Sequence, residues 1–252
     1  SSTSRGLGDV YKRQLVGFDT TSRESNLLLI EFVRDYLTGY GVASELVYNE
    51  ERSKANLFAS IGPVQLPGIV LSGHTDVVPV DGQPWTVPPF ALTGRDGKLF
   101  GRGTADMKGY IACVLALVPA LVKANLRIPV HIALSYDEEV GCLGVRSLLA
   151  VLEQRPVKPM LCIIGEPTEL KPVLGHKGKL AMRCDVHGEA CHSAYAPYGV
   201  NAIEHAAELI GELGRIGLRL REQQDPRFDP PFSTVQTGVI TGGKALNIVP
   251  AD

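Results

Sequence analysis

The stretch Gly68–Asp76 reads GIVLSGHTD, an apolar run of strand type that ends in a histidine and an acid. Two later apolar runs end in the same way. Residues 129–135, PVHIALS, lead into Tyr136-Asp137-Glu138-Glu139, and residues 160–164, MLCII, lead into Gly165-Glu166. Apolar runs without polar alternation are typical of strands buried on both faces. The three runs therefore predict the centre of a sheet that helices cover on both sides.

The segments around these runs complete an α/β pattern. Apolar residues at helical spacing predict helices over about 25–37, 111–122 and 143–153, with Pro119 expected as a kink or an early stop. Further strands are expected at 43–47 and 56–61. Because strands and helices alternate, we predict a mixed, mostly parallel sheet with helices on both faces.

The pattern changes after Lys171-Pro172. Residues 179–186 alternate between apolar and polar, as in a strand with one solvated face, and an amphipathic helix is predicted from Asn201 to about Leu213, before another strand at 234–240. We therefore predict two domains, a catalytic domain over 15–175 and a smaller α+β domain over 176–252. Residues 1–14 (SSTSRGLGDVYKRQ) have no apolar periodicity and are interpreted as a non-native segment.

The composition excludes several classes of function. With 25 Lys+Arg against 27 Asp+Glu, the chain lacks the basic excess that binding to nucleic acid or an anionic membrane requires. No apolar run approaches the ~20 residues that span a bilayer. Five cysteines without metal-type spacing fit a reducing cytoplasm, where we expect them to be small buried residues. These features predict a soluble cytoplasmic protein.

The acids and the histidine that follow the three runs should meet, since ligands bind at the carboxyl ends of strands in such sheets. Asp106, the expected N-cap of the 111–122 helix, should join them. Several carboxylates around one histidine repel each other unless cations are present, and this mixture without thiolate suits Zn²⁺ or a similar divalent metal in a catalytic site. The predicted cluster contains His74, Asp76, Asp106, Glu138, Glu139 and Glu166.

The excess of carboxylates suggests two metal ions that share a bridging carboxylate. Asp76 is close enough in sequence to His74 to accept its other ring N–H. One of the adjacent Glu138 and Glu139 can bind metal while the other takes a proton from water. Taken singly, each residue has an ordinary structural interpretation, as a core histidine, a helix N-cap or a helix-start charge. Three strands that end in this way need a common cause. Lys108 is interpreted as a solvated helix-start residue without a role.

Four segments resemble the family of two-zinc metallopeptidases that includes aminoacylases and carboxypeptidases, and the resemblance runs from Leu15 to Asp252. Its deacylase members are the most similar, through LVGFDTTSRESN (15–26) and KANLFASIGP (54–63). The four segments are SGHTDVVPVDGQPW (72–85), GRGTADMKG (101–109), SYDEEVGCLG (135–144) and IIGEPTELKPVLGHKG (163–178).

The resemblance implies a zinc exopeptidase-like fold and a set of roles. His74 and Glu166 would bind one zinc, Asp106 would bridge, and Glu139 would bind the second. Glu138 would be the general base and acid, and Asp76 would orient His74. Co²⁺ would be able to replace Zn²⁺. The substrate would be a small N-acyl amino acid.

The smaller domain of the family is a lid that also forms a homodimer contact. By resemblance, His192 would help to stabilise the tetrahedral intermediate, and Asn247 would lie near the substrate. The family continues beyond position 252, where a last histidine ligand and a substrate-binding arginine are expected, so the chain is interpreted as truncated. The alternatives are a deacylase for another N-acyl amino acid, such as N-succinyl-diaminopimelate, and an inactive metal-binding fragment.

Overall fold

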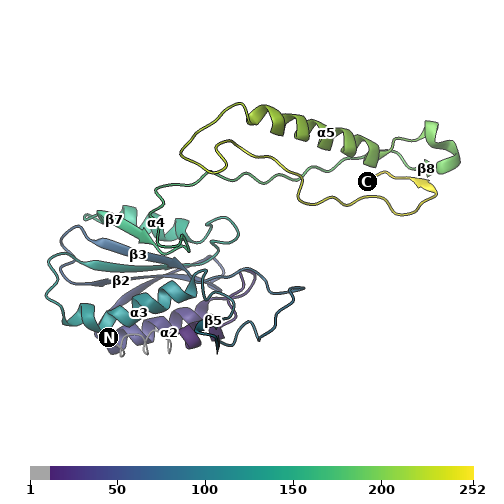
Figure 1. Ribbon diagram of the computed structural model, residues 1–252. Helices are drawn as coiled ribbons and strands as arrows, with labels where there is room; N and C mark the ends of the chain where they lie inside the picture. The colour runs from purple at the N-terminus through teal and green to yellow at the C-terminus, as the bar shows by residue number, and fades with distance from the viewer. Residues whose placement is uncertain (1–11) are drawn as a thin grey trace. The chain divides into compact units, whose positions relative to one another are not determined.

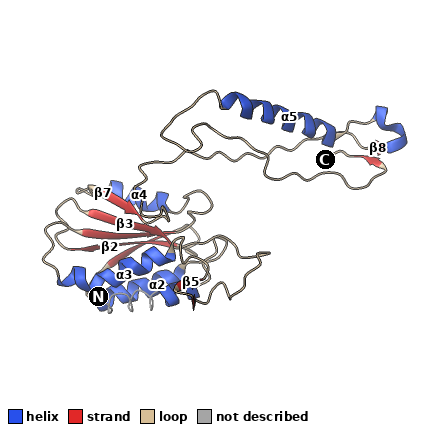
Figure 2. Ribbon diagram, in the orientation of Figure 1, coloured by secondary structure: helices blue, strands red, loops and turns tan. Residues whose placement is uncertain are grey.

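The computed structural model describes residues 12–252, so most of the segment predicted to be non-native, residues 1–11, lies outside the described part. The chain divides into two compact units between Leu170 and Lys171. Figure 1 traces both units, and Figure 2 shows their helices and strands.

The first unit is built on a five-stranded sheet in the order β1-β2-β6-β3-β7. β2 is antiparallel to its neighbours β1 and β6, whereas β6, β3 and β7 are mutually parallel, so four of the five strands run in one direction. The prediction of a mixed, mostly parallel sheet is confirmed. The strands are β1 (Ser44–Tyr48), β2 (Ala55–Ile61), β3 (Ile69–His74), β6 (Val130–Ser135) and β7 (Leu161–Ile164).

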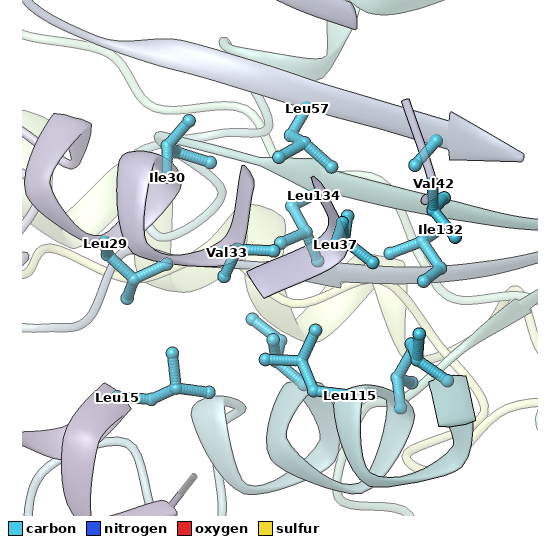
Figure 3. Close-up of a cluster of buried hydrophobic side chains, with 14 of the residues drawn as sticks. Leu15, Leu29, Ile30, Val33, Leu37, Val42, Leu57, Leu115, Ile132 and Leu134 are labelled. Atoms are coloured by element: carbon cyan, nitrogen blue, oxygen red, sulfur yellow. The ribbon is translucent and has the colours of Figure 1, made fainter. Parts of the chain in front are cut away.

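Helices cover both faces of this sheet (Figures 1 and 2). On one face lie α2 (Leu27–Gly39) and α3 (Lys108–Lys123), and on the other lies α4 (Val145–Glu153). Successive residues of a strand point to opposite faces, so Leu57 of β2 packs against α2 and α3 while its neighbour Phe58 packs with α4. Figure 3 shows the larger of the two clusters, in which Leu115 and Leu134 are fully buried. Its apolar contacts hold the sheet and the two helices together.

Pro119 does not stop α3 early, since the helix runs on to Lys123. A proline has no N–H to donate to the carbonyl four residues before it, here Leu115. The hydroxyl of Tyr36 on α2 donates to this carbonyl over 2.9 Å. The helix therefore tolerates the proline because a neighbouring helix supplies the missing donor.

The rest of the first unit includes the hairpin β4 (Thr93–Arg95) and β5 (Lys98–Phe100). None of the described helices is long and apolar enough to cross a bilayer. The five cysteines are free, but four are exposed and Cys191 is half-buried, which corrects the expectation of buried thiols. Cys162, for example, lies on β7, which is an edge strand of the sheet. All four residues of this strand are exposed.

The second unit contains one long helix and a short ladder. The helix α5 (Ala202–Leu220) begins where the side chain of Asn201 accepts the backbone N–H groups of Ile203 and Glu204, and it extends seven residues past the predicted end. The strands predicted at 179–186 and 234–240 do not form. Leu180 is 82% exposed, and no described residues pair with either segment. The ladder joins β8 (Cys191–His192) to β9 (Ile248–Val249), and the 3-10 helix η1 (Ser193–Tyr198) follows β8.

Candidate metal centre

The candidate centre lies where the three parallel strands end. β3 ends at His74, β6 is followed by the turn Asp137–Glu139, and β7 is followed by Glu166. Because the strands are neighbours in register, their ends meet at one edge of the sheet. Asp106 comes from the loop that leads into α3, the helix that contacts β3. The register thus brings together residues that are far apart in the sequence.

The imidazole of His74 is the centre of this group, and it is only 2% exposed. Its Nε2 lies 3.0 Å from Asp106 Oδ1, 3.7 Å from Glu166 Oε1 and 3.8 Å from Glu138 Oε2. One ligand atom from each of His74, Asp106 and Glu139 lies within 4.8 Å of the other two. Imidazole nitrogen with carboxylate oxygens is a donor set that Zn²⁺ and similar divalent ions accept, so the residues present fit a metal ion.

The other ring nitrogen of His74 fixes the orientation of the ring. Nδ1 lies 2.9 Å from the backbone oxygen of Asp76 and 3.5 Å from its carboxylate. A carbonyl oxygen only accepts, so Nδ1 carries a proton, and Nε2 faces the carboxylates. The sequence interpretation gave this task to the Asp76 side chain, whereas the peptide carbonyl of the same residue is the closer acceptor.

The Asp76 carboxylate has additional partners. Its Oδ1 accepts the backbone N–H of Glu138 over 3.1 Å, and its Oδ2 accepts that of Glu139 over 3.2 Å. Oδ2 also accepts the hydroxyl of Ser22 over 2.8 Å. Burial opposes the charge of this carboxylate, but its hydrogen bonds to His74, Ser22 and Glu138 outweigh burial and lower its pKa. Asp76 therefore ties the glutamate pair to the histidine.

The charges of the centre call for a cation. Burial works against a charged His74, yet the hydrogen bond and charge of Asp76, with Glu166 and Asp106, raise its pKa to about 9. Burial first, and then the charge of Asp106 among others, raises the pKa of Glu139. Burial, opposed by His74 and reinforced by Asp106, raises that of Glu166. Each of these groups is driven to bind a proton, and a divalent cation relieves the same repulsion.

Lys108 corrects the sequence interpretation, because it is completely buried. Its Nζ donates to the carbonyl of Phe18 over 2.7 Å, and burial lowers its pKa to about 8. The signal was present in the sequence: Ile111, Ala112 and Leu115 follow at positions i+3, i+4 and i+7, so Lys108 stands on the buried stripe of α3. Ser22, whose hydroxyl donates to the Asp76 carboxylate, gives no such signal.

His192 and Asn247 belong to the second unit. They are neighbours there, since the backbone N–H of Ser193 donates to the carbonyl of Asn247 over 3.0 Å. The ring of His192 accepts the N–H of Ala194 over 3.1 Å and so caps η1. The two residues form a local pair, and their predicted roles stay predictions.

Comparison with known proteins agrees with this fold. The model of peptidase family M20/M25/M40 matches residues 70–234, more than half of the chain. The chain therefore belongs to this peptidase family.

Among the members with curated descriptions, acetylornithine deacetylase is the name that recurs. The protein of this name from Pasteurella multocida is 39% identical over 226 residues, which cover 89% of this chain and 58% of that protein. The one from Myxococcus xanthus is 39% identical over 243 residues, which cover 94% and 62%. The chain thus spans about three fifths of the length of these relatives.

Solved structures share the fold at low sequence identity. An M20 family metallo-carboxypeptidase from Sulfolobus solfataricus aligns with a TM-score of 0.69 at 17% identity and covers 97% of this chain and 68% of its own. A tripeptidase from Staphylococcus aureus aligns with a TM-score of 0.64 at 17% identity and covers 98% and 63%. These similarities concern the fold alone.

Proposed function

We propose that the protein is a metal-dependent amidohydrolase that removes the acetyl group from N2-acetyl-L-ornithine and gives L-ornithine and acetate, a step of arginine biosynthesis. The observation that carries the proposal is the group His74, Asp106 and Glu139, whose ligand atoms lie within 4.8 Å of one another in a chain of this peptidase family. The recurring name of the relatives supports the choice of substrate.

The residues of the centre take distinct roles in this proposal. His74 and Glu166 would hold one Zn²⁺ and Glu139 a second, Asp106 would serve both, and Co²⁺ would be able to replace either ion. The contacts of His74 with Asp106 and Glu166, at 3.0 and 3.7 Å, support the first set of ligands. Asp76 orients His74 and the glutamate pair through the hydrogen bonds described above. Bound ions supply Lewis acidity to the amide carbonyl and to the attacking water.

Glu138 is the proton carrier of the proposed reaction. Its side chain is 38% exposed, and Oε2 lies 3.8 Å from His74 Nε2, so it borders the centre while remaining open to water. Its carboxylate accepts a proton from the attacking water and delivers it to the nitrogen of the leaving amine as the amide bond breaks. The backbone N–H of Glu138, held by Asp76, keeps the side chain at this border.

The remaining assignments extend the same proposal. Residues 15–175 form the catalytic domain, and residues 176–252 belong to a lid that supports a homodimer of the whole protein in the cytoplasm. His192 acts on the tetrahedral intermediate, and Asn247 contacts the substrate. The capping role of His192 supports a fixed ring orientation, since its Nδ1 already accepts the N–H of Ala194.

The test is deacetylation of N2-acetyl-L-ornithine by the whole protein loaded with zinc, measured as release of ornithine. N-acetylated amino acids of other kinds and N-succinyl-diaminopimelate serve as the comparison panel. The highest kcat/KM on acetylornithine supports the proposal. A higher value on another substrate replaces the proposed one, and no turnover of any of them by a zinc-loaded protein refutes the hydrolase.

A further inference from the structure

Lys54 precedes β2, and none of the roles proposed above uses it. Its Nζ lies 2.5 Å from the backbone oxygen of Ser22 and 2.6 Å from Oδ1 of Asp137. The side chains of Lys54 and Asp137 are only 14% and 17% exposed, so the ion pair is shielded from water. A charge pair in such surroundings holds its geometry better than one on the surface.

The two groups that Lys54 binds belong to the two segments that hold Asp76. Ser22 donates its hydroxyl to the Asp76 carboxylate over 2.8 Å. Asp137 directly precedes Glu138 and Glu139, whose backbone N–H groups donate to the same carboxylate. Lys54 therefore closes a ring of contacts around Asp76, and this ring includes the segment that carries the glutamate pair.

The turn at Asp137 needs such a tie. Asp137 has φ +55°, a left-handed conformation that costs free energy in any residue other than glycine. The Lys54 ammonium holds the side chain of this residue, and the backbone of Leu143 donates to its carbonyl over 3.0 Å. Without the ammonium, the turn loses the contact that anchors it to the segment of Ser22.

We propose that Lys54 is a positioning residue of the metal centre. By joining Ser22 to Asp137, it fixes where Glu138 and Glu139 stand relative to His74. The inference rests on the proposed function in one respect, namely that Glu139 binds a metal ion.

Electrostatics and positioning predict opposite effects for the loss of this lysine. Removing a positive charge near a cation site favours binding of the cation, because the repulsion between like charges is lost. Loosening a residue that orients ligands weakens binding, typically by about 10–100-fold. A drop in metal affinity on removal of Lys54 is therefore a signature of positioning that charge alone does not produce.

The experiment uses the metal-free whole protein and Zn²⁺, with affinity measured by competition with a chromophoric chelator. K54M should bind Zn²⁺ about 10–100-fold more weakly than the wild type. K98M, which removes an exposed lysine of β5, is the matched control and should bind as the wild type does. K54R keeps the charge and the donors and should recover part of the loss. K54M/D137N removes the carboxylate that K54M leaves unpaired, and its affinity should remain low.

Amide hydrogen exchange of Glu138 and Glu139 in the metal-free chain gives a second, independent measurement. Exchange should be faster in K54M by about tenfold or more, the change that corresponds to losing a hydrogen bond to a charged group. Unchanged exchange, Zn²⁺ affinity in K54M equal to or above that of the wild type, or full recovery in K54M/D137N would overturn the inference. A wild-type chain that binds no Zn²⁺ would instead overturn the proposed metal centre, and hydrogen exchange would still decide the role of Lys54.

Discussion

Replacing Asp76 with asparagine removes a charge with almost no change in volume, and the cost can be worked out from the contacts of the carboxylate. Oδ1 accepts the N–H of Glu138, while Oδ2 accepts the N–H of Glu139 and the hydroxyl of Ser22. An amide has one acceptor oxygen and one NH₂ group. With either placement of the amide, NH₂ faces a backbone N–H that can only donate, so one of the two glutamate N–H groups loses its partner.

The expected loss in the free energy of unfolding is about 3 kcal/mol. An unsatisfied buried N–H costs about 1–3 kcal/mol. The hydrogen bond to the other glutamate N–H changes from a charged to a neutral acceptor, and this weakens it by roughly 1 kcal/mol, since a bond to a charged group contributes about 1.5–3 kcal/mol and a neutral one about 0.5–1.5. The two contributions share one side chain and are not strictly additive.

The pH dependence of this loss follows from the lowered pKa of Asp76. In the unfolded chain the carboxyl titrates near its ordinary value of 3.8, and in the folded chain it titrates lower. The stabilisation is therefore fully present above the unfolded pKa and disappears as the pH falls through the folded pKa. The difference between wild type and D76N should be constant above about pH 5 and should shrink below about pH 4.

Chemical denaturation of the metal-free proteins between pH 3 and pH 8 measures this difference. D35N, which changes an exposed aspartate of α2, is the control and should differ from the wild type by less than about 0.5 kcal/mol. A D76N protein within that same margin at pH 7 would refute the hydrogen-bond account. A penalty that persists unchanged to pH 3 would show that the lost charge is not its cause.

Three further predictions concern other parts of the first unit. Glu138→Gln should lower kcat by about 10²–10⁴-fold and leave the zinc content unchanged, as measured by metal analysis, and retained turnover would exclude Glu138 as the proton carrier. Between pH 8 and 10.5 the unfolded chain holds a proton on Lys108 that the folded chain releases. The free energy of unfolding of the wild type relative to that of K108M should therefore rise with pH over this window, as measured by chemical denaturation. A difference between the two proteins that does not change with pH would contradict the burial of the ammonium. Tyr36→Phe should lower the free energy of unfolding by about 1 kcal/mol, because the Leu115 carbonyl loses its donor. The loss should be smaller in a Pro119→Ala background, where residue 119 regains a backbone N–H that can donate to this carbonyl. Equal losses in both backgrounds, measured by thermal or chemical unfolding, would rule out this explanation.

Much of the first unit could be predicted from local patterns because its strands and helices are stabilised where the patterns place their apolar residues. Leu57 and Phe58 show how closely face and sequence correspond, since adjacent residues enter clusters on opposite sides of the sheet. The prediction of a strand failed where the sequence pattern indicates which side chains share a face but not which strand would pair with the segment. Residues 179–186 alternate as a strand does, but a strand forms only when another backbone pairs with it, and in the described part of the chain none does.

The residues of the candidate centre fall into two groups. Some follow the ends of strands and could be predicted, whereas others come from distant segments and could not. His74, Glu138 and Glu166 could be grouped from the sequence because each follows an apolar run, and the carboxyl ends of parallel strands meet at one edge. Ser22 and Lys54 could not, because a single hydroxyl or ammonium has no periodicity and its partner is chosen by how loops fold over the sheet. Lys108 lies between these cases, since its helical register indicates burial while its charge argues for solvent. The carbonyl of Phe18, in a neighbouring loop, makes burial possible by accepting a hydrogen bond from the ammonium. The local sequence thus determines which residues can be metal ligands, whereas their positions depend on contacts that form only in the folded chain. For this reason substitutions at the supporting residues test the centre more sharply than substitutions at the ligands.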